Sequence, residues 1–274
     1  MTARWTNIRM EHKKLRGTST AEPCRVNVLG VGISAIDQDF AIKQIDAWIT
    51  NDDREYITVC TVNTVMECQK SVTMREAINN AGMATPDGMP LVWLANWESN
   101  QSVKRVYGPD LMLAVCELSL KQGYRHYLYG GAEGVPEQLA AELQIRFPGI
   151  QIVGTFSPPF RSLTPAEEED VIEMINVAKP DIIWVGLGTP KQDLWMAKFR
   201  SRLNAPVMIG VGAAFDFHTK RIPQAPAWMQ RSGLEWLYRL FQEPKRLWYR
   251  YVVYNPWFVL KILGQKTGLR KYQL

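Results

Sequence analysis

The sequence of 274 residues predicts an α/β fold: a Rossmann-like parallel sheet, or two smaller ones, flanked by helices and followed by a basic, aromatic helical appendage. Short apolar runs alternate with amphipathic stretches, which is typical of parallel strands covered on both faces. A hydrophobic fraction of 46% and a charged fraction of 22% are those of a globular protein. No uninterrupted apolar run reaches the length of about eighteen residues that a membrane-spanning helix needs.

Strands and helices are expected in alternation from Arg25 onward. Apolar runs predict strands at Val26–Val31, Tyr56–Val62, His126–Tyr129, Ile150–Thr155, Ile182–Gly186 and Val207–Val211. Amphipathic periodicity predicts helices at Phe40–Thr50, Gly108–Lys121, Val135–Phe147, Pro165–Ala178 and Lys191–Leu203. This body covers residues 23–230, as one sheet or as two lobes meeting near residues 100–125. The polar residues 1–22 predict a flexible arm.

The remaining segment, residues 231–274, differs from the body in charge and in aromatic content. It holds nine Lys/Arg against two acids, about +7, whereas residues 1–230 sum to about −2. It also holds ten of the 29 aromatic residues. Such a segment is typical of membrane contact, of protein docking or of nucleic-acid binding, and the near-neutral body disfavours nucleic acid.

Four arginines of this segment are candidate phosphate ligands, because a guanidinium binds a diphosphate through two parallel hydrogen bonds. The spacing of Arg239, Arg246 and Arg250 allows them to share one helical face despite Pro244. Arg231 belongs to the same basic set.

Polar residues follow several of the predicted strands, where ligands of open α/β sheets bind. Thr61 and Asn63 end one strand, Asp87 lies in a turn rigidified by proline and glycine, and Asp216 follows the last strand. The Asp87 carboxylate, held in a rigid turn, is a candidate general base, whereas Asn63 and Asp216 are candidate residues of the donor pocket. The alternative roles of Asp87 and Asp216 are helix capping and ion pairing.

Two glycine-containing turns lead from a strand into a helix. One contains Gly130 and Gly131, and the other contains Gly188, Thr189 and Gln192. Backbone N–H groups at such turns can bind phosphates, so the pair favours a nucleotide diphosphate, although either turn alone is also an ordinary tight turn. Neither matches a dinucleotide fingerprint or a P-loop, and no His, Cys, Asp or Glu spacing indicates a metal site.

Six ordered motifs resemble the bacterial WecG/TagA/CpsF family of glycosyltransferases, from about Val26 to Trp257. They are Thr85-Pro-Asp-Gly-Met-Pro90, Arg105-Val-Tyr-Gly-Pro-Asp110, Tyr129-Gly-Gly131, Gly186-Leu-Gly-Thr-Pro-Lys-Gln192, Gly212-Ala-Ala-Phe-Asp216, and Pro226-Ala-Trp-Met229 with Gly233-Leu-Glu-Trp236. Any one motif is weak, but their number and order make the resemblance specific.

The resemblance implies an inverting transferase that moves a sugar from a UDP-sugar to a polyprenyl-diphosphate-linked sugar, without a metal and with no cofactor besides the donor. It places the base on Asp87 and an active-site threonine on Thr61. It further implies peripheral attachment to an anionic surface at the cytoplasmic face of the cell membrane. N-acetylmannosamine, glucose and related donor sugars all fit, and a homo-oligomer is left open.

The competing interpretation is a soluble nucleotide-binding regulatory module whose basic segment docks to a protein. Transfer of a sugar to a lipid-linked acceptor distinguishes an enzyme from such a module.

Overall fold

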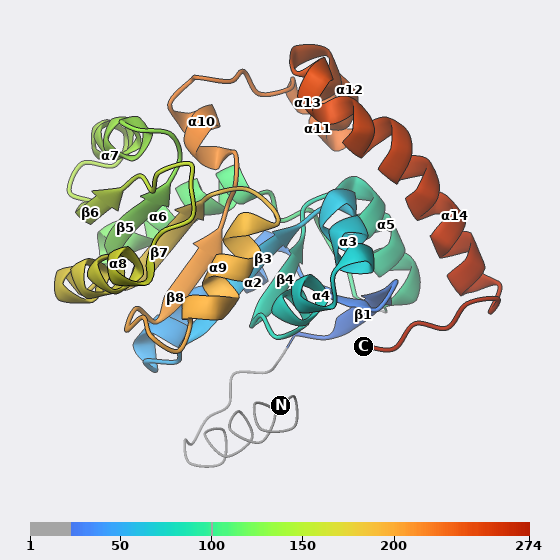
Figure 1. Cartoon of the computed structure of the whole chain (residues 1–274), viewed down its shortest axis with the longest axis horizontal. Helices are drawn as coiled ribbons and strands as arrows, with labels where there is room; N and C mark the ends of the chain where they lie inside the picture. The colour runs from blue at the N-terminus through green and yellow to red at the C-terminus, as the bar shows by residue number, and fades with distance from the viewer. Residues whose placement is uncertain (1–22, 100) are drawn as a thin grey trace.

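The structure, a computed structural model, describes residues 23–99 and 101–274, so the predicted N-terminal arm lies outside the described residues. Its centre is one six-stranded sheet in the order β4-β3-β8-β7-β5-β6 (Figure 1), in which every neighbouring pair is parallel. The strands are β3 (Glu55–Cys60), β4 (Met83–Pro86), β5 (Arg125–Gly130), β6 (Gln151–Phe156), β7 (Ile182–Gly186) and β8 (Val207–Gly210). The predicted parallel fold is confirmed, with the strands in one sheet rather than in two.

Helices cover both faces of this sheet. They are α2 (Gln38–Thr50), α3 (Val62–Lys70), α4 (Val72–Asn79), α5 (Met89–Glu98), α6 (Gly108–Gln122), α7 (Val135–Arg146), α8 (Pro165–Ala178), α9 (Lys191–Phe199) and α10 (Ala214–His218). On β7, Trp184 packs in the core with α2, α6 and α7, whereas Val185 packs on the opposite face with α8 and α9. This alternation within an apolar strand is what a sheet buried on both faces requires.

One predicted strand is wrong in its role. The run Val26–Val31 is not a strand of the parallel sheet, because Leu29 and Gly30 turn the chain with positive φ angles. The result is a separate antiparallel hairpin of β1 (Arg25–Val28) and β2 (Val31–Ser34). Its apolar side chains instead join a core with α3, α4, α5 and β4.

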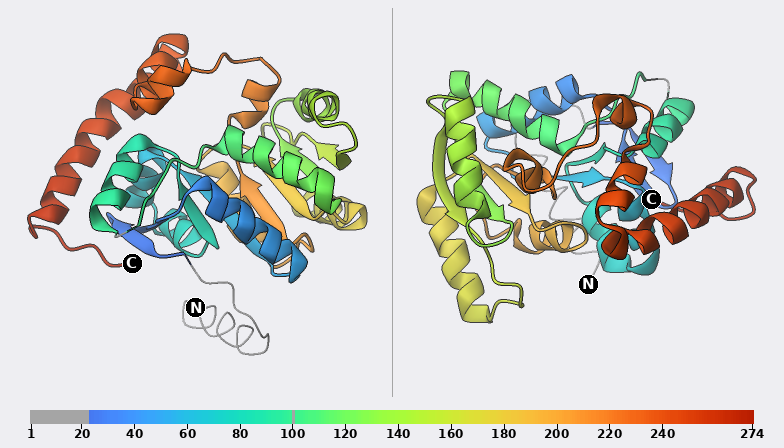
Figure 2. Two further views of the ribbon diagram at one scale, coloured as in Figure 1. Left: turned by 180° about the vertical axis from the view of Figure 1, so that it is seen from behind. Right: turned by 90° about the horizontal axis from the view of Figure 1, so that it is seen from above.

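The C-terminal segment folds back along one side of the body (Figures 1 and 2). It consists of α11 (Ala227–Arg231), α12 (Glu235–Gln242), α13 (Pro244–Trp248), the π-helical turn η1 (Tyr249–Val253) and α14 (Tyr254–Lys266). Tyr254 and Phe258 are buried in the core that contains the hairpin. Further along, Gln265 exchanges hydrogen bonds with the hairpin backbone, at 2.9 Å to both Leu29 N and Asn27 O.

No helix in residues 23–99 or 101–274 combines the length and the apolarity needed to cross a bilayer.

Candidate active site

The Asp87 turn is fixed by the strand ends around it. The amides of Asp87 and Gly88 donate to the Cys60 carbonyl at the end of β3, at 2.9 and 3.2 Å. Helix α5 then begins at Met89, with Gly88 as its N-cap. The side chain of Asp87 is 13% exposed, so the turn holds this carboxylate almost buried but still reachable from solvent.

Thr61 lies directly beside this turn, because it follows Cys60 and caps α3. A Cβ added at Gly88 would lie 3.4 Å from the Thr61 Cα, so the two backbones are in contact. The Thr61 amide donates to the Thr64 hydroxyl at 3.1 Å, and Asn63 is buried in the first turn of the helix. The structure therefore brings Thr61, Asn63 and Asp87 together at the carboxyl ends of β3 and β4.

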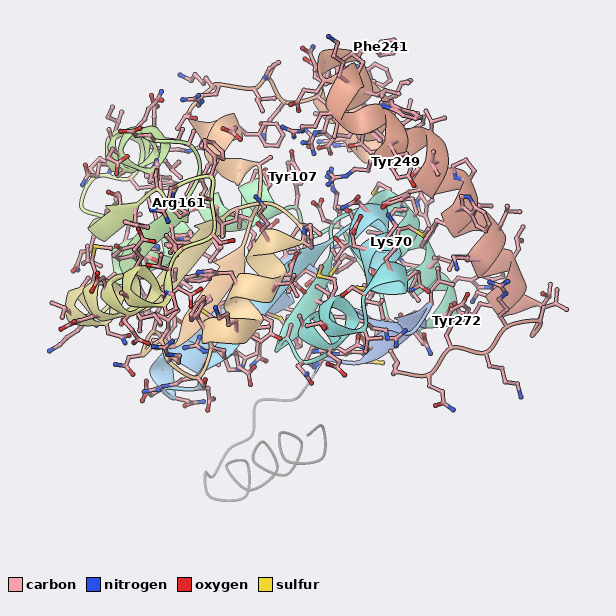
Figure 3. All side chains as sticks on the ribbon, in the orientation of Figure 1. Lys70, Tyr107, Arg161, Phe241, Tyr249 and Tyr272 are labelled. Carbon is pink, nitrogen blue, oxygen red and sulfur yellow. The ribbon has the colours of Figure 1, made fainter. Side chains whose placement is uncertain are left out.

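Arg105 is the main partner of the Asp87 carboxylate, although it was not among the predicted site residues. Its Nε donates to Asp87 Oδ1 at 2.9 Å and to the Asp87 carbonyl at 2.6 Å, while Nη2 lies 2.8 Å from Oδ1. The same Nη2 lies 2.6 Å from Glu235 Oε2 on α12. The guanidinium carbon is 4.0 Å from the centre of the Tyr107 ring. Figure 3 shows Tyr107 between the strand ends and the tail helices.

These surroundings change the acidity of Asp87. Burial raises its pKa to about 6, and the charge of Glu235 also raises it, while Arg105 and Arg239 oppose the increase. A carboxyl group with a pKa near the working pH can accept a proton and later release it. Of the two Asp87 carboxylate oxygens, Oδ1 is the one that Arg105 contacts.

The first glycine turn lies at the end of β5. Gly130 has a φ of +122°, and a Cβ there would lie 2.7 Å from the Gly186 backbone. The Gly131 amide donates to the Gly186 carbonyl at 2.9 Å. These two glycines thus join β5 to β7, and the Gly131 N–H group is already bonded within the protein.

The second turn, after β7, is held by the side chain of Gln192. Its Oε1 accepts from the amides of Gly188 and Gly212 at 3.1 and 3.0 Å. The Thr189 hydroxyl donates to Asp193 at 2.8 Å. Burial raises the pKa of Asp193 to about 7. Asp193 was not among the predicted site residues, because nothing in the neighbouring sequence distinguishes it. Gln192 therefore links the loops after β7 and β8.

The predicted row of strand-end residues is extended across the sheet. Neighbouring strands lie about 4.8 Å apart. Because β3 and β8 lie between β4 and β7, the ends of β4 and β7 are roughly 14 Å apart in total. A ligand that touched both Asp87 and the Gly188 turn would have to span this distance.

Asp216 lies in the first turn of α10 and faces the tail. Burial raises its pKa, and the charges of Arg221, Arg246 and Arg239 oppose this effect. The nearest ion pair, with Arg221 Nε, has an N–O distance of 3.9 Å. Asp216 thus belongs to the charged region between the sheet and the tail.

Three of the four predicted arginines gather in this region. The expectation that they share one helical face is wrong, because the chain bends at Glu243 and they lie on α12, α13 and η1. The three arginines nevertheless remain close: burial lowers the pKa of Arg250, and the charges of Arg239 and Arg246 add to that decrease. Arg231 is exposed at the end of α11.

Arg239 lies beside helix α10. Its guanidinium carbon lies 5.7 Å from the Phe217 ring centre. Its Nε is buried and has no hydrogen-bond acceptor among the described residues. A buried N–H group without an acceptor destabilises the folded state, and an anion bound here would supply the acceptor.

The chain matches a known family and several curated proteins over most of its length. The profile described as the glycosyl transferase WecG/TagA/CpsF family matches residues 26–272. Relatives from Bacillus spizizenii and Staphylococcus aureus are each 25% identical, over 85% and 90% of this chain and 91% and 95% of their own lengths. A Bacillus subtilis relative is 27% identical over 72% of this chain and 74% of its own. All three are named N-acetylglucosaminyldiphosphoundecaprenol N-acetyl-beta-D-mannosaminyltransferase.

The match spans the hairpin, the sheet with its strand-end carboxylate, and the arginine-bearing tail, which is the full extent of the site described above. The resemblance found in the sequence motifs is thereby confirmed: the chain belongs to the WecG/TagA/CpsF family of glycosyltransferases.

Proposed function

We propose that this glycosyltransferase moves N-acetylmannosamine from a UDP-sugar to a hydroxyl of N-acetylglucosamine linked to a polyprenyl diphosphate, with inversion at the sugar carbon. The names of the three relatives supply the transferred sugar and the acceptor. The observation that carries the chemistry is the nearly buried Asp87 carboxylate, which lies close to Arg105 and, on the tail, to Arg239.

Asp87 is suited to act as the general base. Its Oδ2 would take the proton of the acceptor hydroxyl as that oxygen attacks C1 of the donor sugar. The bond between C1 and the UDP oxygen then breaks on the opposite side, and UDP leaves with the bonding electrons. Thr61, beside the Asp87 turn, is placed to orient a substrate by one hydrogen bond.

The arginines of the tail are suited to balance the charge of a diphosphate. Arg239 offers a buried donor without an acceptor in the described chain, and Arg246 and Arg250 lie close enough to affect the same groups. Guanidinium groups bind diphosphate oxygens in pairs and would stabilise the leaving charge. We therefore propose a reaction that needs no metal ion.

The outer surface of the tail is suited to lie on an anionic membrane. Its inner side packs on the body, while Phe241 on α12 is 77% exposed and Leu263 on α14 is 55% exposed. Trp97 of the neighbouring helix α5 is 75% exposed and lies beside Lys266 of the tail. Exposed aromatic and apolar side chains among basic residues suit the headgroup region, where each cation contributes on the order of 1 kcal/mol.

The test is transfer from a panel of UDP-sugars to a short-chain polyprenyl-diphosphoryl N-acetylglucosamine, with and without EDTA. We expect a disaccharide product only with UDP-N-acetylmannosamine, and a rate that EDTA leaves unchanged. Arg239→Ala should reduce turnover strongly. Binding of UDP without transfer to any acceptor would favour the regulatory module instead, and a rate that EDTA abolishes and Mg²⁺ restores would refute the metal-free mechanism.

A further inference from the structure

One guanidinium is shared between two carboxylates from distant parts of the chain. Arg105 Nη2 lies 2.8 Å from Asp87 Oδ1 and 2.6 Å from Glu235 Oε2. Laid end to end, these distances limit the separation of the two carboxylate oxygens to about 5.4 Å. Asp87 belongs to the end of the sheet and Glu235 is the first residue of α12, so Arg105 joins the body to the tail at the site itself.

Glu235 is held firmly in this position. Its side chain is 15% exposed, and its second oxygen, Oε1, accepts from the Tyr107 hydroxyl at 3.3 Å. The Tyr107 ring in turn stacks under the Arg105 guanidinium, 4.0 Å from it. Both Glu235 oxygens are therefore engaged by the short segment that precedes α6, which fixes the start of α12 above Asp87.

The charges that face Asp87 come from two elements. Arg105, beside Tyr107, comes from the segment before α6, while Glu235 and Arg239 come from α12. A pair made of Asp87 and Arg105 alone would be a neutralised salt bridge, and its carboxylate would be a weak proton acceptor. Glu235 draws on the same guanidinium and adds a like charge nearby, which raises the proton affinity of Asp87.

We propose that Glu235 is a positioning residue for sugar transfer: through Arg105 it docks α12 over the Asp87 turn, and by sharing that guanidinium it keeps the Asp87 carboxylate able to take a proton. This inference rests on the proposed role of Asp87 as the base. Docking of the tail and the proton affinity of the Asp87 carboxylate are thereby coupled, because both depend on the ion pair between Arg105 and Glu235.

The size of the effect follows from the geometry. The interaction of two unit charges about 5 Å apart shifts a pKa by roughly 0.5 pH units if the dielectric constant is that of bulk water. The shift is roughly 2 pH units if the dielectric constant is that of a protein surface. Replacing Glu235 by the neutral, isosteric glutamine should therefore lower the pKa of Asp87 by about 0.5 to 2 pH units. The amide oxygen can still accept from Arg105, so the fold should be kept.

The first measurement is independent of activity. In the full chain with ¹³C-labelled aspartate, the side-chain carboxyl resonance of Asp87, assigned with Asp87→Asn, is followed against pH. We expect Glu235→Gln to move its midpoint to lower pH by 0.5 to 2 units, and Glu235→Asp, which restores the charge, to recover part of the difference. Glu98→Gln is the matched control, since it removes another acid that pairs with the tail, through Lys266, away from Asp87.

The second measurement is the pH profile of transfer. The acidic limb of kcat/KM should move to lower pH in Glu235→Gln, and kcat on the plateau should fall several-fold because the base is weaker. The limb of Glu98→Gln should stay at the wild-type position.

An Asp87 midpoint that is unchanged in Glu235→Gln, or that shifts equally in Glu98→Gln, overturns the proposal even if the wild type transfers sugar. A wild type without transfer overturns the proposed function but leaves the NMR result to decide the coupling. If Glu235→Gln does not fold, Glu235→Ala, which also removes the charge, is followed in its place, and an Asp87 midpoint equal to that of the wild type there overturns the proposal.

Discussion

Replacing Asp87 by asparagine tests the assignment of the base most directly, because the structure predicts opposite effects on activity and on stability. Asparagine keeps the size of the side chain and can still accept a hydrogen bond from Arg105 at the Oδ1 position. It cannot take a proton from the acceptor hydroxyl. We expect transfer to fall by about two to four orders of magnitude, the range for a lost general base, while UDP affinity changes little.

The stability change follows from the pKa of the carboxyl group. In the folded chain burial raises the pKa of Asp87 to about 6 from an ordinary value of 3.8. Because the folded pKa is the higher one, the folded state holds the proton more tightly, and Asp87 reduces stability as pH rises from about 4 to about 6. The full difference corresponds to about 3 kcal/mol as an upper limit. Asparagine carries no such cost.

The assay is thermal unfolding of both proteins between pH 4 and pH 8, beside their transfer rates. Asp87→Asn should have the higher Tm above pH 6, at about 2 to 4 °C per kcal/mol, and the difference should vanish near pH 4. The wild-type rate should fall to about a tenth of its plateau one pH unit below the pKa of Asp87. Near wild-type turnover in the variant, or a Tm difference independent of pH, would refute the assignment.

Three further predictions concern the surroundings of the site. Thr61→Ala should reduce turnover less than Asp87→Asn, because a hydroxyl only orients or donates one hydrogen bond, and an equal loss in steady-state kinetics would contradict this. Gly130→Ala should lower Tm more than Gly188→Ala, because the Gly130 Cβ would meet the Gly186 backbone, whereas a Cβ at Gly188 meets nothing within 4 Å and adds only the strain of a φ of +72°. We also expect Gly188→Ala to weaken UDP binding measured by calorimetry, and an unchanged affinity would show that the second turn is purely structural. Leu263→Asp, on the exposed face of α14, should reduce co-sedimentation with anionic vesicles but not transfer to a short-chain acceptor, and unchanged sedimentation would argue against that face.

The sequence by itself determined the alternating α/β body and the basic tail. Continuous apolar strands such as Ile182–Gly186 have no polar face to expose to water, so both of their faces are buried only in a sheet that helices cover on both sides. The order of motifs was sufficient to identify the family, and the Pro/Gly turn around Asp87 was recognised from residue types alone. These are local signals, and each acts within a few residues.

Local signals misjudged the segments whose partners are distant. The run Val26–Val31 is apolar enough for a strand of the sheet, yet the turn at Leu29 and Gly30 folds it into a hairpin whose core is partly supplied by Phe258 of the tail. The short strand β4 has four residues, too few to give a periodic pattern, and it is defined by its pairing with β3.

Only the tertiary structure decided what surrounds Asp87. Arg105 and Glu235 are separated by 130 residues, and no spacing in the sequence relates them. The bend at Glu243 separates Arg239 from Arg246 and Arg250 on different helices and still leaves them close together. Burial and charge at a site depend on which elements meet in space, so the acidity of Asp87 is set by its burial, by Arg105 and by the charges of the docked tail, and the turn alone does not determine it.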